Sequence, residues 1–74
     1  MTQATQDMEF DVRGMTCGGC EASVVRAVQK VTGVVEARAD HRAGRVHVRA
    51  LADVEPAAVR GRIEGAGYDV IGGP

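Results

Sequence analysis

Apolar and charged residues alternate along three stretches of the chain, 8–13, 34–40 and 45–50. A period of two with one charged side is the pattern of a half-buried β-strand. The short spacing between the second and third stretches favours an antiparallel hairpin. The sides expected to face the core are Met8, Phe10 and Val12, then Val35, Ala37 and Ala39, and finally Val46 and Val48.

Two further stretches show the spacing of one face of an amphipathic helix. We expect the first helix to begin at or just before Cys20 and to end at Gly33. The second begins near Pro56, because proline suits a first helical turn, and ends within 65–67. A brief fourth strand is expected over 68–71. The apolar faces consist of Val24, Ala27, Val28 and Val31, and of Val59, Ile63 and Ala66.

The predicted order βαββαβ is that of the ferredoxin-like α+β fold, a four-stranded antiparallel sheet with both helices on one face. Chain direction alternates through the six elements. The loops after the first strand, the second strand and the second helix should therefore meet at one end. We expect one domain over 8–71, a flexible lead-in over 1–7 and a tail over 72–74.

Composition and charge exclude several classes of function. The 74-residue chain has a net charge of −1, and its only aromatic residues are Phe10 and Tyr68, which does not suit a nucleic-acid surface. No apolar run is long enough for a membrane-spanning helix. The polar segment 1–7 has no signal-peptide core. We therefore expect a cytoplasmic protein, in a compartment that keeps accessible thiols reduced.

The chain has two cysteines, Cys17 and Cys20, which two glycines separate. Thiols at this spacing can bind one metal ion. The N-terminus of the following helix should lower the pKa of Cys20 below about 8.5. We expect Gly18 and Gly19 to adopt backbone conformations that side chains forbid. Two thiolates with no Asp or Glu between them favour a soft ion, with Cu(I) first, over a four-ligand structural zinc site. Glu21 follows Cys20 directly but should point along the helix.

Met15 and His41 are further candidate ligands. Met15 either anchors the loop in the core or supplies a thioether. His41 lies at the cysteine end by topology, but its strand should be at the sheet edge, away from the loop. His47 should point outward from its strand into solvent.

The motif Gly14-Met15-Thr16-Cys17-Gly18-Gly19-Cys20, between a strand and a helix, resembles the heavy-metal-associated domain family, specifically its small bacterial copper chaperones. The similarity extends over about 8–71 and includes the segments 32–34 and 65–68. It implies a non-enzymatic carrier that binds Cu(I) through Cys17 and Cys20. The carrier would pass the ion by ligand exchange to a copper-transporting P-type ATPase or a copper-responsive regulator.

The resemblance also implies which residues surround the two thiols. It places Met15 under the loop, with Thr16 and Tyr68 near the site. Tyr68 is typical of bacterial members, whereas many eukaryotic copper chaperones have lysine there. Its hydroxyl either contacts the sulfurs or its ring merely caps the loop. Because two such exposed sites can share Cu(I), we also expect that two copies of the chain can form a homodimer bridged by copper.

The chain departs from the family pattern at Ala37 and Ala39, where larger β-branched residues are common, and at His41, where an apolar residue is common. Three alternative functions stay open at this point. One is a metal-binding domain for Hg(II) or Zn(II). Another is a thiol–disulfide protein, although no proline is placed as in thioredoxin-like sites. The third is a domain of a longer transporting ATPase.

Overall fold

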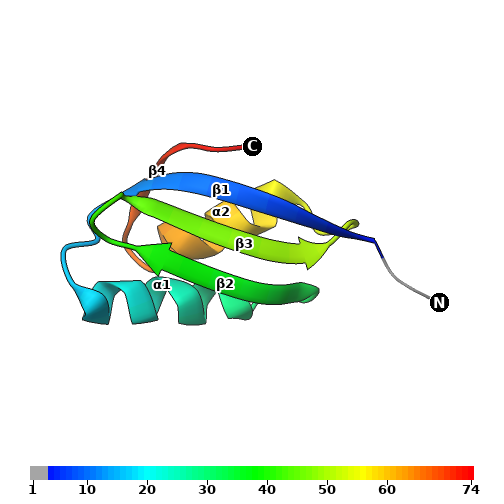
Figure 1. Ribbon diagram of the computed structural model, residues 1–74, viewed down its shortest axis with the longest axis horizontal. Helices are drawn as coiled ribbons and strands as arrows, with labels where there is room; N and C mark the ends of the chain where they lie inside the picture. Colours follow the sequence, from blue (N-terminus) through cyan, green and yellow to red (C-terminus); the bar gives the residue numbers. More distant parts are fainter. Residues whose placement is uncertain (1–3) are drawn as a thin grey trace.

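The computed structural model describes residues 4–74, and it contains six helices and strands in the predicted order. The strands form one antiparallel sheet with the order β2-β3-β1-β4, and both helices lie on one side of it (Figure 1). This arrangement confirms the ferredoxin-like α+β fold. The elements are β1 (Thr5–Arg13), α1 (Gly18–Gln29), β2 (Val34–Asp40), β3 (Arg45–Leu51), α2 (Pro56–Gly65) and β4 (Asp69–Gly72).

The core lies between the sheet and the two helices. Strands β1 and β3 contribute alternate residues to it, and each helix contributes residues four positions apart, as the two periods require. Full burial of a side chain of this kind stabilises the fold by about 1.5–3 kcal/mol. The largest fully buried side chains are Phe10, Val24, Val28, Val46, Val48, Val59 and Ile63.

The alternation predicts that the first strand begins at Met8, but strand β1 begins three residues earlier, at Thr5. The polar residues Thr5–Asp7 pair with β3, so backbone hydrogen bonds hold them rather than burial. The side-chain amide of Gln6 donates to the carbonyl oxygens of Leu51 at 3.1 Å and Val54 at 2.8 Å. The predicted lead-in is thus shorter than 1–7, and its residues 1–3 lie outside the described part of the chain.

The prediction that Val35 faces the core is wrong. The register of β2 against β3 shifts between Val34 and Glu36, as in a β-bulge. An extra residue in one strand reverses the alternation of the residues beyond it. Val34 therefore packs against the core with Ala37 and Ala39, whereas Val35 is 59% exposed.

Smaller differences occur at the other ends of elements. Helix α1 ends at Gln29, four residues before the predicted stop at Gly33. Ala66 is exposed, because it caps the C-terminus of α2 instead of extending its apolar face. Strand β4 is displaced by one residue and includes Gly72, which the sequence pattern assigns to the tail.

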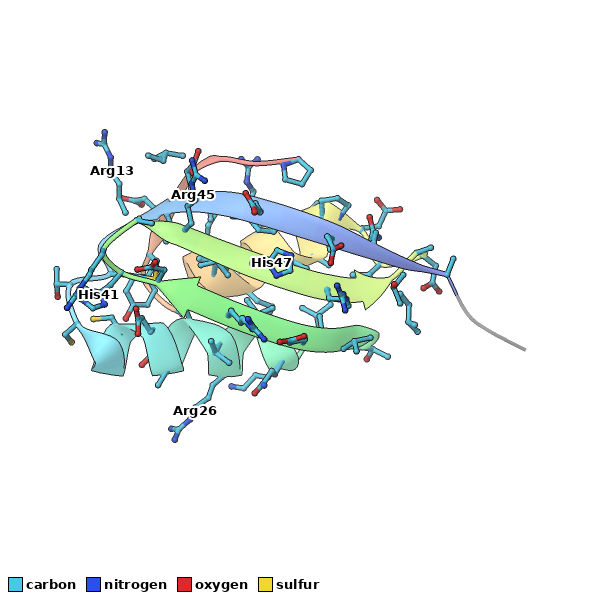
Figure 2. The ribbon with its side chains drawn as sticks, viewed as in Figure 1. Arg13, Arg26, His41, Arg45 and His47 are labelled. Atoms are coloured by element: carbon cyan, nitrogen blue, oxygen red, sulfur yellow. The ribbon has the colours of Figure 1, made fainter. Side chains whose placement is uncertain are left out.

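Ion pairs between β1 and β3 cover the outer face of the sheet. Arg49 lies 3.1 Å from Asp7, and Arg45 lies 3.5 Å from Asp11. His47 lies on this outer face, as predicted, with its Nε2 3.5 Å from Asp7 (Figure 2). Because these pairs are exposed to solvent, they support the strand register more than the overall stability.

Neither helix within residues 4–74 has the length and apolar character needed to cross a membrane.

The core can be tested with one substitution at two positions. Ile63→Val removes a methylene from a fully buried side chain and should lower the free energy of unfolding by about 0.5–1.5 kcal/mol. Ile71→Val, at a side chain that is 57% exposed, is the matched control and should change it by less than about 0.5 kcal/mol. Urea unfolding followed by circular dichroism measures both. Equal losses in the two variants would contradict this placement of the core.

Candidate metal centre

Three segments that are distant in the sequence meet at one end of the domain, as the alternation of chain direction predicts. They are the loop from β1 to α1 with the start of α1, the turn between β2 and β3, and the loop from α2 to β4 (Figure 1, left side). Both cysteines, His41 and Tyr68 belong to these segments. The fold therefore gathers the candidate residues at a single surface.

The start of α1 sets the relative positions of the two thiols. Cys17 is the N-cap residue, with an extended backbone, and Cys20 is the third residue of the helix. The carbonyl oxygen of Cys17 accepts hydrogen bonds from the N–H groups of Cys20 at 3.1 Å and Glu21 at 3.2 Å. Both cysteines are free, Cys17 is exposed and Cys20 half-buried, and their sulfurs lie 3.7 Å apart. One turn of helix thus places both sulfurs within reach of one ion.

Hydrogen bonds stabilise the thiolate of Cys20 and lower its pKa to about 6. The main cause is the backbone N–H of Thr16, followed by the hydroxyls of Tyr68 and Thr16 and then the thiol of Cys17, while partial burial opposes the shift. The direction agrees with the sequence-based prediction. The principal cause differs from the prediction. Hydrogen bonds from specific donors lower the pKa of Cys20, whereas the sequence predicts that the N-terminus of the helix lowers it.

Tyr68 contacts the site in two ways. The interaction of its hydroxyl with the thiolate of Cys20 is the main cause that raises the pKa of Tyr68. Its ring lies against Gly14, where an added Cβ would be 3.3 Å from Cδ1 of the tyrosine. Gly14 also has a φ of 104°, which side chains disfavour. The contact of the hydroxyl with Cys20 favours the interpretation in which Tyr68 interacts with the sulfurs over the one in which its ring only caps the loop.

The glycine that permits the loop is Gly14, and the expectation for Gly18 and Gly19 is wrong. Both lie in the first turn of α1, and neither has a positive φ. A Cβ at Gly18 would meet nothing within 4 Å. Their small size leaves the surface beside Cys17 open instead of permitting an unusual backbone.

Met15 lies in the hydrophobic core beneath the loop, with 7% of its surface exposed. The structure therefore supports the interpretation of Met15 as an anchor. Within residues 4–74, no group of three or more His, Cys, Asp or Glu side chains is arranged to hold a metal ion. The candidate donor set consists of the two cysteine sulfurs.

His41 is at the cysteine end but bonds to α1 (Figure 2). Its backbone N–H and its Nδ1 both lie 2.7 Å from Oε2 of Glu21, the residue after Cys20. Strand β2 is at the sheet edge, as predicted, yet the turn after it reaches the helix. This pair differs from the prediction that Glu21 points along the helix. Only the topology could have suggested the contact.

Residues 9–69 match the family model of the heavy-metal-associated domain. Copper chaperone CopZ of Staphylococcus aureus is 34% identical to the chain over 63 residues, which cover 84% of the chain and 93% of CopZ. Copper-transporting ATPase 1 of Rhizobium meliloti (strain 1021) is 37% identical over 62 residues. These cover 84% of the chain but only 8% of the ATPase.

Solved structures show the same similarity in three dimensions. The water-soluble region of the P-type ATPase CopA from Bacillus subtilis superposes with a TM-score of 0.86 and is 29% identical in sequence. The match covers 96% of this chain and 48% of the CopA region. The chain is thus similar both to a small chaperone and to a domain of a larger transporter.

The hydrogen bonds at Cys20 predict how its reactivity depends on pH. Because the thiolate is the nucleophile, alkylation of Cys20 by iodoacetamide should rise with pH around a midpoint near 6. Tyr68→Phe removes one donor to the thiolate, so the midpoint for alkylation of Cys20 should lie at a higher pH in this variant. Fragmentation of the tryptic peptide 14–26 assigns the modified cysteine. An identical midpoint in the two proteins would show that the tyrosine hydroxyl does not stabilise the thiolate.

Proposed function

Because the chain belongs to the heavy-metal-associated domain family, we propose that it is a carrier of Cu(I) and not an enzyme. The ion binds between the sulfurs of Cys17 and Cys20 and leaves by ligand exchange to the metal-binding domain of a copper-transporting P-type ATPase. A copper-responsive regulator is the other acceptor that this chemistry allows. The proposed location is the cytoplasm, where both thiols stay reduced.

The observation that carries this proposal is the pair of free sulfurs 3.7 Å apart, without a third ligating side chain in the part of the chain that the structure describes. Metal–thiolate bonds of about 2.3 Å span this separation in a bent arrangement. A linear arrangement needs about 4.6 Å between the sulfurs, and hence an opening of about 1 Å. The site accordingly suits an ion that accepts two soft ligands and tolerates a change of angle.

The two thiols differ in how firmly the protein holds them. Cys20 lies in α1, is half-buried and accepts hydrogen bonds from Thr16 and Tyr68. Cys17 is exposed at the N-cap and makes no side-chain capping bond. In the transfer step, a thiolate of the acceptor adds to the copper ion as a third sulfur ligand, and the Cu–S bond to Cys17 then breaks. The ion keeps its charge, and no electron is transferred.

The donor set also favours Cu(I) over the alternative cargoes. Zn(II) in structural sites takes four ligands, and only two thiols are available here. The nearest carboxylate in the sequence, Glu21, is occupied by His41. Hg(II) also accepts two thiolates, so the similarity to copper chaperone CopZ and to copper ATPases supports copper over mercury.

A groove between the two helices suits an acidic surface of the acceptor. It encloses about 380 Å³, and its lining includes Arg26, Lys30 and Arg62. Arg26 points away from α1 into solvent (Figure 2). In residues 4–74, the ion pairs formed by arginine lie on the sheet side, and none includes these three cations. Their charge is therefore available to steer a partner of opposite charge.

Copper binding tests the proposal directly. The protein should take one Cu(I) from a strong Cu(I) chelator under reducing conditions, as the absorbance of the chelator reports. Cys17→Ser and Cys20→Ser should each lose most of this binding, because one thiolate alone cannot form the two-sulfur site. Thr32→Ser, an exposed conservative change near the other end of α1, is the control and should bind normally. Unchanged binding in both cysteine variants would contradict the proposal.

The role of the groove can be tested separately by charge reversal. Arg26→Glu/Lys30→Glu should slow copper transfer to the metal-binding domain of a copper-transporting ATPase from the same organism, by about tenfold at low salt. The affinity for Cu(I) should stay unchanged. Arg38→Glu/Arg45→Glu makes the same change of net charge on the outer face of the sheet and is the control. Equal slowing by both double variants would show a general charge effect and contradict docking at the groove.

A further inference from the structure

The turn between β2 and β3 touches the chain on both sides of the cysteine loop. On one side, the carbonyl oxygen of Gly44 accepts a hydrogen bond of 2.7 Å from the N–H of Val12, near the end of β1. On the other side, His41 bonds to Glu21 in the first turn of α1. The turn therefore connects the segment that leads into the loop with the segment that follows it.

The contact between His41 and Glu21 is specific and partly shielded from solvent. Two donors, the backbone N–H and the ring Nδ1, converge on one carboxylate oxygen, each at 2.7 Å. The two side chains are 29% and 28% exposed. The turn that presents His41 is itself ordered, because Oδ1 of Asp40 accepts the N–H groups of Arg42 at 2.9 Å and Ala43 at 3.3 Å. A rigid turn thus holds the histidine against the helix.

The first turn of α1 needs such support. It contains Gly18 and Gly19, which disfavour helix, and its N-cap residue Cys17 makes no side-chain capping bond. Helix ends without caps fray easily. Yet this turn determines the separation of the two sulfurs, since Cys17 and Cys20 lie on it.

We propose that Glu21 and His41 form a brace that holds the first turn of α1 closed and thereby keeps both cysteine sulfurs positioned for the metal ion. The inference rests on the proposed function and deepens it, because a brace that keeps the turn closed slows the release of copper. Glu21 and His41 are positioning residues, and they act on the ion only through the helix turn.

The brace should be visible in the metal-free protein by amide hydrogen exchange. In Glu21→Ala, exchange at the N–H groups of residues 20 and 21 should be about tenfold faster, as expected for local opening of the turn. His41→Ala removes the ring donor but keeps the backbone N–H that binds Glu21, so its increase should be smaller. The double variant should show no further increase over Glu21→Ala, because Glu21→Ala alone removes the acceptor of both bonds. The amide of Val28, deeper in α1, reports global stability and should exchange at the original rate.

Copper release provides the second measurement. Transfer of Cu(I) from the loaded protein to a chelator should be several-fold faster in both single variants. Arg42→Ala, at the exposed neighbour of His41, is the control and should behave as the original protein. Unchanged exchange at Cys20 would overturn the brace, and faster exchange with unchanged copper release would overturn its role in metal retention. If the original protein binds no Cu(I), the proposed function fails, and the exchange result alone decides whether the brace exists.

Discussion

Cys17 is the N-cap of helix α1, and this starting point controls the geometry of both thiols. The carbonyl oxygen of Cys17 closes the first turn by accepting the N–H groups of Cys20 and Glu21. A start one residue later or earlier would rotate Cys20 by about 100° relative to the loop, since a helix has 3.6 residues per turn. The sulfur pair, the donors to Cys20 and the contact of Glu21 with His41 all depend on this turn.

The domain separates a firmly packed part from a weakly held one. Valines of α1 and α2 pack with Phe10 and the valines of β3 in a core that excludes solvent. The cysteine loop lies at the edge of this core, anchored by Met15 from below and covered on one side by Tyr68. The proposed exchange of an ion requires exposure of the ligands, and exposure removes the burial that would otherwise hold them. At this site, hydrogen bonds and contacts with neighbouring turns therefore hold the side chains in position, whereas apolar packing holds them elsewhere in the domain.

Charge is divided between the two faces in a similar way. On the outer face of the sheet, carboxylates of β1 lie beside the arginines of β3, and the pairs neutralise one another. Beside the helices, Arg26, Lys30 and Arg62 line a groove whose lining includes no carboxylate. A net charge of −1 conceals this division, because it sums over both faces. The helix side is thus the face on which a docked partner would encounter uncompensated positive charge.

The sequence by itself determined the order of the elements, the main core positions and the pair of cysteines, because periods of 2 and 3.6 are local properties of the chain. It also placed His41 and Tyr68 at the cysteine end, since chain direction follows from element order. Only the tertiary structure decided that Val34 and not Val35 faces the core, because a bulge depends on the pairing with β3. Likewise, Tyr68 and the Cys20 thiolate that it stabilises are 48 residues apart in the sequence. Glu21 and His41, which contact each other, are 20 residues apart. Such contacts depend on distances in space, which no local pattern of residues specifies.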